Sequence, residues 1–189
     1  LRSHLHIEKA HLVGHSLGGM IGPAYTRKFP NYVFSLSMLS SAAFRTNNDK
    51  QKILDVIEKI SKQGIDVILP TLITRWFTDD FILKNPKIIS NRMEQVRNTD
   101  LKTFLRVFWI YATCTMETWL NEIKIPCLIM TGENDVGCNP QFNEQIANAI
   151  PDSKLVILKN LKHTITLESP VLVGKKIREF LLNLKETIK

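Results

Sequence analysis

Short apolar runs and longer amphipathic stretches alternate toward both ends of the chain. Four runs are short and apolar enough to be buried strands. They span residues 10–13, 33–39, 125–131 and 154–158. Apolar residues recur with helical spacing in the segments that follow, which are residues 17–29, 49–63, 140–149 and a last helix that begins at Ser169-Pro170. Strands that alternate with helices predict an α/β fold, in which a parallel sheet carries helices on both faces.

The middle of the chain follows a different pattern. From about residue 64 to residue 120 the spacing is mainly helical, aromatic residues are frequent, and no convincing strand interrupts it. A helical block of this length between two strands predicts a cap inserted into the α/β core. We therefore expect core residues at 1–44, a helical cap at 45–120 and core residues again at 121–189.

Composition narrows the possible partners and compartments. No stretch approaches the roughly 18 apolar residues of a membrane span, so we expect no membrane contact. The three cysteines form no CxxC pair, which argues against a disulfide framework or a zinc site and favours the reducing cytoplasm. The net charge of +7 is spread out and does not alternate with exposed aromatics, so we expect no nucleic-acid partner. We expect neither a metal nor a cofactor.

One short motif carries chemistry. Gly14-His15-Ser16-Leu17-Gly18 has the G-x-S-x-G spacing of a nucleophile elbow, and it stands between a predicted strand and a predicted helix. On such a turn the serine hydroxyl is pushed above the sheet, and only small residues fit two positions before and two after it. The Leu17 amide, at the start of the helix, is then aimed at a developing oxyanion. An ordinary glycine-rich turn is the alternative interpretation.

A serine nucleophile needs a base, and the base needs an acid to orient it. His163 follows the fourth predicted strand, and Asp135 follows the third. Catalytic groups gather at the carboxyl ends of parallel strands, so Ser16, Asp135 and His163 have the expected order and positions. Glu133 competes with Asp135 for the role of the acid.

Three neighbouring residues have simpler interpretations. We expect His15 to pack or to form a hydrogen bond, pointing away from the serine. Cys127 lies within a predicted strand and is expected in the core. Cys138 stands close to Asp135 and is expected to be exposed, with no obvious partner to activate it.

These segments resemble the α/β-hydrolase superfamily. The matching pieces are His11-Leu-Val-Gly-His-Ser-Leu-Gly-Gly-Met20, Ile125-Pro-Cys-Leu-Ile-Met-Thr-Gly-Glu-Asn-Asp135, and Leu161-Lys-His163 followed by Glu168-Ser-Pro170. The resemblance implies a serine hydrolase with Ser16 as nucleophile, Asp135 as acid and His163 as base. It also implies that the Leu17 amide is one oxyanion donor.

Within the superfamily, the cap is similar to that of 3-oxoadipate enol-lactonases. The similar strings are Arg75-Trp76-Phe77-Thr78, Phe81, Asn85-Pro86 and Thr99-Asp100. This resemblance implies that Trp76 faces the substrate. The chain departs from those enzymes after the acid, where Val136-Gly137 stands in place of an Asp-Pro pair.

The start of the chain also departs from the superfamily, whose members normally have four strands before the elbow. The loop after the third of those strands supplies the second oxyanion donor. The resemblance therefore implies an N-terminally incomplete chain, with about 80 residues preceding it. The remaining sheet is expected to have four strands, with the nucleophile strand as an exposed apolar edge.

The function implied is a serine hydrolase that cleaves an ester or lactone, such as an enol-lactone, of a small carboxylated molecule through an acyl-enzyme. The alternatives are a cofactor-free haloperoxidase, a hydrolase or lyase acting on a carbon–carbon bond, and an inactive ligand-binding module. The expected partner is a small molecule, and the oligomeric state stays open.

Overall fold

Four parallel strands form the centre of the structure, a computed structural model that describes residues 2–187. The strands are β1 (Ala10–His15), β2 (Val33–Leu39), β3 (Cys127–Gly132) and β4 (Ser153–Leu158). They pair in the order β1-β2-β3-β4, and every pair is parallel. The predicted parallel sheet is therefore confirmed, and its strands lie within two residues of the apolar runs that predicted them.

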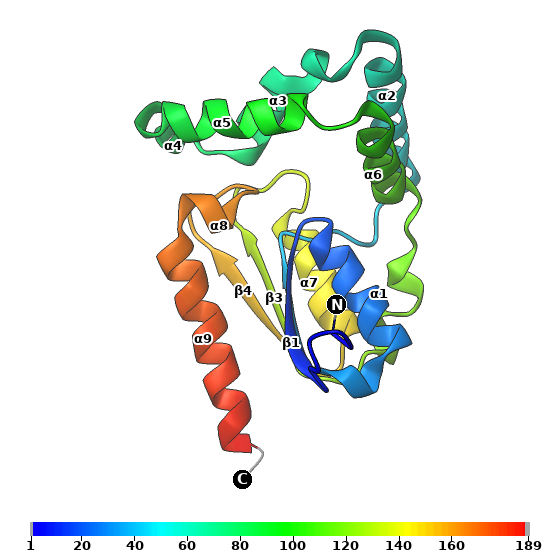
Figure 1. Cartoon of the computed structure of the whole chain (residues 1–189), viewed down its shortest axis with the longest axis vertical. Coiled ribbons are helices and arrows are strands. Elements are labelled where there is room, and N and C mark those ends of the chain that lie inside the picture. Colours follow the sequence, from blue (N-terminus) through cyan, green and yellow to red (C-terminus); the bar gives the residue numbers. More distant parts are fainter. Residues whose placement is uncertain (1, 188–189) are drawn as a thin grey trace.

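Helices cover both faces of this sheet (Figure 1). They are α1 (Gly18–Lys28), α7 (Pro140–Ala149), α8 (Ile165–Glu168) and α9 (Pro170–Thr187). Side chains alternate between the faces along each strand. Cys127 and Ile129 of β3 therefore pack in one cluster with Ile146 of α7, while Leu128 and Met130 pack in another with residues of α9. The predicted α/β fold with two covered faces is confirmed.

Five helices between β2 and β3 lie beyond the carboxyl ends of the strands (Figure 1). They are α2 (Asn47–Gln63), α3 (Leu69–Trp76), α4 (Asp79–Lys84), α5 (Pro86–Arg97) and α6 (Leu101–Thr113). They bury a hydrophobic cluster of their own, which runs in sequence from Ile60 to Phe104. Short 3₁₀ turns cover residues 30–32, 65–68, 116–118 and 120–122.

Capping residues explain where α2 and α6 begin. The Thr46 hydroxyl accepts from the Asp49 amide at 3.2 Å, and the Asp49 carboxylate accepts from the Thr46 amide at 3.0 Å. This reciprocal pair is a capping box. It starts α2 at Asn47, two residues earlier than the apolar spacing predicts. Asp100 caps α6 in a similar way, because its side chain accepts from the Thr103 amide at 2.8 Å.

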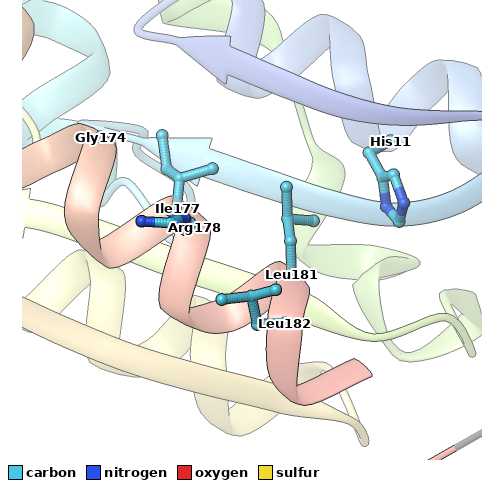
Figure 2. A pocket seen from close by; sticks show the side chains of 6 residues that line it. All are labelled: His11, Gly174, Ile177, Arg178, Leu181 and Leu182. Carbon is cyan, nitrogen blue, oxygen red and sulfur yellow. The ribbon is translucent and has the colours of Figure 1, made fainter. Parts of the chain in front are cut away.

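Strand β1 lies at the edge of the sheet, as expected. Within residues 2–187 it pairs only with β2, and its Val13 side chain is 51% exposed. A hollow of about 360 Å³ is lined by His11 of β1 and by residues of α9, which are Gly174, Ile177, Arg178, Leu181 and Leu182. Figure 2 shows how these residues lie. None of these residues is a serine, a cysteine or a carboxylate, so the hollow is not a candidate for covalent chemistry.

The residues that the structure describes include no helix that is both long enough and apolar enough to cross a membrane.

Two glycines are expected to respond in opposite ways to an added methyl group. A Cβ on Gly132, at the end of β3, would collide with the carbonyl oxygens of Lys162 and Leu161. We expect Gly132→Ala to lower the free energy of unfolding by about 1–3 kcal/mol, because rigid backbone must shift. A Cβ on Gly174 meets nothing within 4 Å, so Gly174→Ala should raise it by about 0.5–1 kcal/mol. Urea titration of both variants measures the difference, and equal stabilities would contradict this packing.

Candidate active site

Ser16 occupies a sharp turn between β1 and α1. Its φ of 55° lies in the left-handed region, which non-glycine residues rarely adopt. The turn is tied to the neighbouring strand, because the Ser16 amide donates to the Leu39 carbonyl at 2.8 Å. Gly19 closes the turn by donating its amide to the Ser16 carbonyl at 2.9 Å. The backbone at Ser16 is therefore strained, and the surrounding structure holds it there.

The prediction that only small residues fit two positions before and two after Ser16 holds for the first of these positions and not for the second. A Cβ on Gly14 would collide with the backbone of Gly18, so a small residue is required two positions before the serine. A Cβ on Gly18 itself meets nothing within 4 Å in the described part of the chain. The second tight position is Gly19, whose added Cβ would collide with the Ser41 hydroxyl. The prediction that position 18 needs a small residue is wrong, because the close approach falls one residue later.

The three side chains singled out from the sequence meet at one point. Ser16 Oγ lies 3.0 Å from His163 Nε2, and His163 Nδ1 lies 2.8 Å from Asp135 Oδ2. The His163 and Asp135 side chains are 12% and 1% exposed. Glu133, the alternative acid, instead accepts from the Asn160 amide at 3.1 Å near the surface. Asp135 is therefore the carboxylate beside His163.

Asp135 is held by hydrogen bonds on both carboxylate oxygens. Its Oδ1 accepts from the amides of Gly137 and Cys138, each at 2.9 Å, while Oδ2 accepts from His163. Burial by itself would raise the pKa of Asp135. The hydrogen bonds from His163 and from the two amides outweigh that effect and lower the pKa below its usual range. Asp135 therefore stays charged and fixes the proton of His163 on Nδ1.

Two side chains at the carboxyl ends of β1 and β2 hold the backbone of His163 in place. Its carbonyl accepts from Ser40 Oγ and from His15 Nε2, both at 2.9 Å. Burial and the nearby charge of His163 lower the pKa of His15 to about 4, so His15 is a neutral donor. The expected hydrogen-bonding role of His15 is present.

The imidazole of His163 is a stronger base than an ordinary histidine. Burial acts to lower its pKa, but the hydrogen bond to Asp135 and the adjacent Cys138 outweigh burial and raise the pKa. The arrangement therefore stabilises the imidazolium that forms when the neutral ring accepts a proton during a reaction.

Cys138 is buried, with 8% of its surface exposed, so the expectation of an exposed thiol is wrong. The turn that hydrogen-bonds its amide to Asp135 also draws its side chain inward. Among residues 2–187, the ligand atoms of Asp135, Cys138 and His163 form the one such group that could hold a metal ion, all lying within 4.8 Å of one another. The carboxylate and the imidazole already hydrogen-bond each other. Cys127 lies in the core as expected, and burial raises the pKa of its thiol to about 12.

Trp76, the residue of the helical block singled out from the sequence, lies beside His163. The two rings are stacked with their centroids 6.4 Å apart. The Trp76 carbonyl accepts from the amide and the hydroxyl of Thr164, at 3.0 and 2.8 Å. Glu168 adds a second link, because its carboxylate accepts from the Thr78 amide at 2.8 Å and from the Lys162 amide at 3.0 Å. The segment that joins α3 to α4 is thus bound to the loop that carries His163.

Three further residues approach this point without having been predicted. Tyr111 of α6 places its hydroxyl 3.4 Å from Ser16 Oγ. The Arg92 guanidinium lies over the Trp76 ring, 5.3 Å from its centroid, and Arg45 donates to the Gly137 carbonyl at 3.4 Å. The only sequence signal for Tyr111 is a hydroxyl at the end of an otherwise apolar run in α6.

Leu17, whose amide is expected to donate to an oxyanion, directly follows Ser16 in the chain. Leu17 is the N-cap of α1 and has helical dihedral angles. Amides in the first turn of a helix have no partner inside the helix, and they lie at the positive end of its dipole.

Known proteins are similar to this chain over most of its length. The chain is 26% identical over 190 residues to the monoacylglycerol lipase ABHD6 of Bos taurus, covering 94% of this chain and 56% of that protein. It is 25% identical over 170 residues to 3-oxoadipate enol-lactonase 2 of Acinetobacter baylyi, covering 90% of this chain and 62% of that protein. The chain thus spans less than two thirds of the length of both relatives.

The fold is also that of known hydrolase structures. The enol-lactonase from Burkholderia xenovorans LB400 superposes with a TM-score of 0.87 at 20% identity, covering 96% of this chain and 68% of that one. The family described as serine aminopeptidase, S33, matches residues 2–170. The chain therefore belongs to this S33 family of α/β-hydrolases.

Proposed function

We propose that the protein is a serine hydrolase that cleaves an ester or a lactone through an acyl-enzyme. The observation that carries this proposal is the continuous hydrogen-bond chain from Ser16 Oγ through both nitrogens of His163 to a charged, buried Asp135. Nucleophile, base and acid with these contacts are the constellation of acyl-transfer enzymes. The names of the two relatives, a monoacylglycerol lipase and an enol-lactonase, support a carbonyl substrate of this kind.

In this mechanism Ser16 Oγ attacks the carbonyl carbon while His163 Nε2 takes the hydroxyl proton. The Asp135 carboxylate stabilises the resulting imidazolium, and the Leu17 amide donates to the oxyanion. His163 then passes the proton to the leaving oxygen. Water then attacks the acyl carbon while His163 takes one of the water protons. His163 returns this proton to Ser16 Oγ as the bond between Oγ and the acyl carbon breaks, which releases the acid and restores Ser16.

We further propose that the substrate carries a carboxylate and that Trp76 contacts it. Arg45 and Arg92 support this, because neither forms an ion pair among the side chains that the structure describes. Both act electrostatically on Tyr111, whose hydroxyl lies beside Ser16. Arg45 also has a buried Nε without a hydrogen-bond partner. Guanidinium groups near the nucleophile that have no carboxylate partner among the described side chains suit a small anionic molecule. The cytoplasmic location stays a prediction from the sequence.

Covalent labelling tests the nucleophile. A fluorophosphonate probe should modify the wild-type protein at Ser16, as determined by mass spectrometry of the labelled peptide. Ser16→Ala should abolish labelling, whereas Ser61→Ala, which removes an exposed hydroxyl on α2, should leave it unchanged. An unlabelled wild-type protein, or a Ser16→Ala variant that labels normally, would contradict the proposal. Two further assays test the alternative activities. Halogenated products formed from peroxide and halide would indicate a haloperoxidase, and cleavage of a carbon–carbon bond would indicate the alternative hydrolase or lyase.

The pH dependence tests the roles of His163 and Asp135. Only neutral imidazole can accept the Ser16 proton, so kcat/KM for an activated aryl ester should rise with pH through the pKa of His163. Asp135 holds that pKa above the ordinary value of 6.5, so the midpoint should lie above 6.5.

Asp135→Asn should move this midpoint downward, because burial then acts without the opposing charge. It should also lower kcat by about 10⁴-fold. Glu133→Gln, on the same loop, is the matched control and should keep the wild-type profile. A wild-type midpoint at or below 6.5, or an effect of Glu133→Gln equal to that of Asp135→Asn, would argue against these roles.

Substrate charge tests the two arginines. Arg45→Gln and Arg92→Gln should each lower kcat/KM for an aryl ester of a dicarboxylic acid by about 10- to 100-fold, the worth of one charged hydrogen bond. The same variants should hydrolyse the matching uncharged ester at nearly the wild-type rate. Arg106→Gln, an exposed arginine on α6, is the control. Equal losses on both esters would mean that the arginines support the fold and do not select the substrate.

A further inference from the structure

The hydroxyl of Ser16 has two neighbours that can hydrogen-bond to it. One is His163 Nε2 at 3.0 Å, and the other is the phenol oxygen of Tyr111 at 3.4 Å. Tyr111 belongs to α6 and stands 95 positions after Ser16 in the sequence. The helical block thus brings one polar group directly to the nucleophile.

The direction of the Tyr111 hydrogen bond follows from counting protons. A serine hydroxyl has one proton, and it points to neutral His163 Nε2 when the histidine acts as base. The phenol must then be the donor to Ser16 Oγ. Burial raises the pKa of Tyr111, although the hydrogen bond to Ser16 and the charges of Arg45 and Arg92 oppose this effect. The phenol therefore keeps its proton and stays a donor at neutral pH.

Tyr111 is also held in place before any substrate arrives. Its ring packs edge-to-face against Phe108 at a centroid distance of 5.7 Å, and it contacts the cluster between the sheet and α7. A donor fixed in a partly buried site needs little rearrangement when charge develops, and such donors contribute most to lowering a barrier. The contact of 3.4 Å is long for a hydrogen bond between hydroxyl groups, and contacts of this kind tighten once substrate is bound.

We propose that Tyr111 donates a hydrogen bond to the oxyanion of the tetrahedral intermediate, alongside the Leu17 amide. This inference rests on the proposed serine hydrolase function. As Ser16 Oγ bonds to the carbonyl carbon, its proton passes to His163 Nε2 and the C=O π pair moves onto the carbonyl oxygen. That oxygen is attached to the same carbon as Oγ, so the phenol, which lies 3.4 Å from Oγ, has a newly charged acceptor beside it. Tyr111 keeps its own proton throughout.

An oxyanion donor differs from a donor to the leaving group in when it acts. The oxyanion forms twice, first as the acyl-enzyme is made and again as water attacks it. A donor to the oxyanion therefore speeds both half-reactions, whereas a donor to the leaving alcohol speeds only the first. The two roles make different predictions for one variant.

Tyr111→Phe removes the hydroxyl and keeps the ring that packs on Phe108. In the purified protein we expect kcat to fall about 100-fold, the lower end of the loss for an oxyanion donor, with KM changed little. Pre-steady-state measurements with aryl esters should find acylation and deacylation slowed by similar factors. The acylation loss should be the same for good and poor leaving groups. Tyr32→Phe alters an exposed tyrosine directly before β2, at the amino ends of the strands and thus at the opposite edge of the sheet from Ser16, and it should match the wild type.

Three outcomes would overturn the proposal. They are wild-type kinetics for Tyr111→Phe, a loss confined to acylation of poor leaving groups, and a loss that appears only in KM. Fluorophosphonate labelling separates this failure from failure of the proposed function. A Tyr111→Phe variant that labels and turns over like an active wild type rejects the donor alone, whereas a wild type without labelling or esterase activity rejects the function as well.

Discussion

The common direction of the four strands is the constraint on which the candidate site depends. Because every strand is parallel to its neighbour, all four carboxyl ends open onto the same edge of the sheet. Ser16, Ser40, Asp135 and His163 each follow a different strand, so they meet there although Ser16 and His163 stand 147 positions apart. A single antiparallel strand would send one of these loops to the opposite edge and disconnect the hydrogen-bond chain.

A buried charge at such an edge is stable only when its hydrogen bonds are satisfied. Asp135 meets this requirement with two backbone amides and the imidazole, so the protein backbone replaces much of the water that the carboxylate loses. The carbonyl of His163 is satisfied by Ser40 and by a neutral His15. His15 adds no second charge beside the base, and the charged group that contacts the His163 imidazole directly is therefore the Asp135 carboxylate.

The sequence was informative where a local pattern determined the outcome. Strong apolar runs located the strands, and their order along the chain placed Ser16, Asp135 and His163 on loops at one edge. Contacts that depend on how distant segments pack together could not be predicted from the sequence. The approach of Tyr111 depends on the path of α6 over the sheet, and the crowding at Gly19 in place of Gly18 depends on where Ser41 lies. The burial of Cys138 follows from a turn around Asp135 that composition does not encode. The division of the chain at residues 44 and 120 stays a prediction.

Glu168 links the helices between β2 and β3 to the loop that carries His163. One of its carboxylate oxygens holds Thr78 between α3 and α4, and the other holds Lys162 next to His163. Lifting the segment around Thr78 breaks this charged hydrogen bond together with the two hydrogen bonds that the Trp76 carbonyl accepts from Thr164. The charged bond alone costs about 1.5–3 kcal/mol, so a lifted state would be populated in fewer than roughly one molecule in ten. Access that requires this movement would therefore be intermittent, and removing the Glu168 carboxylate would make the lifted state more frequent.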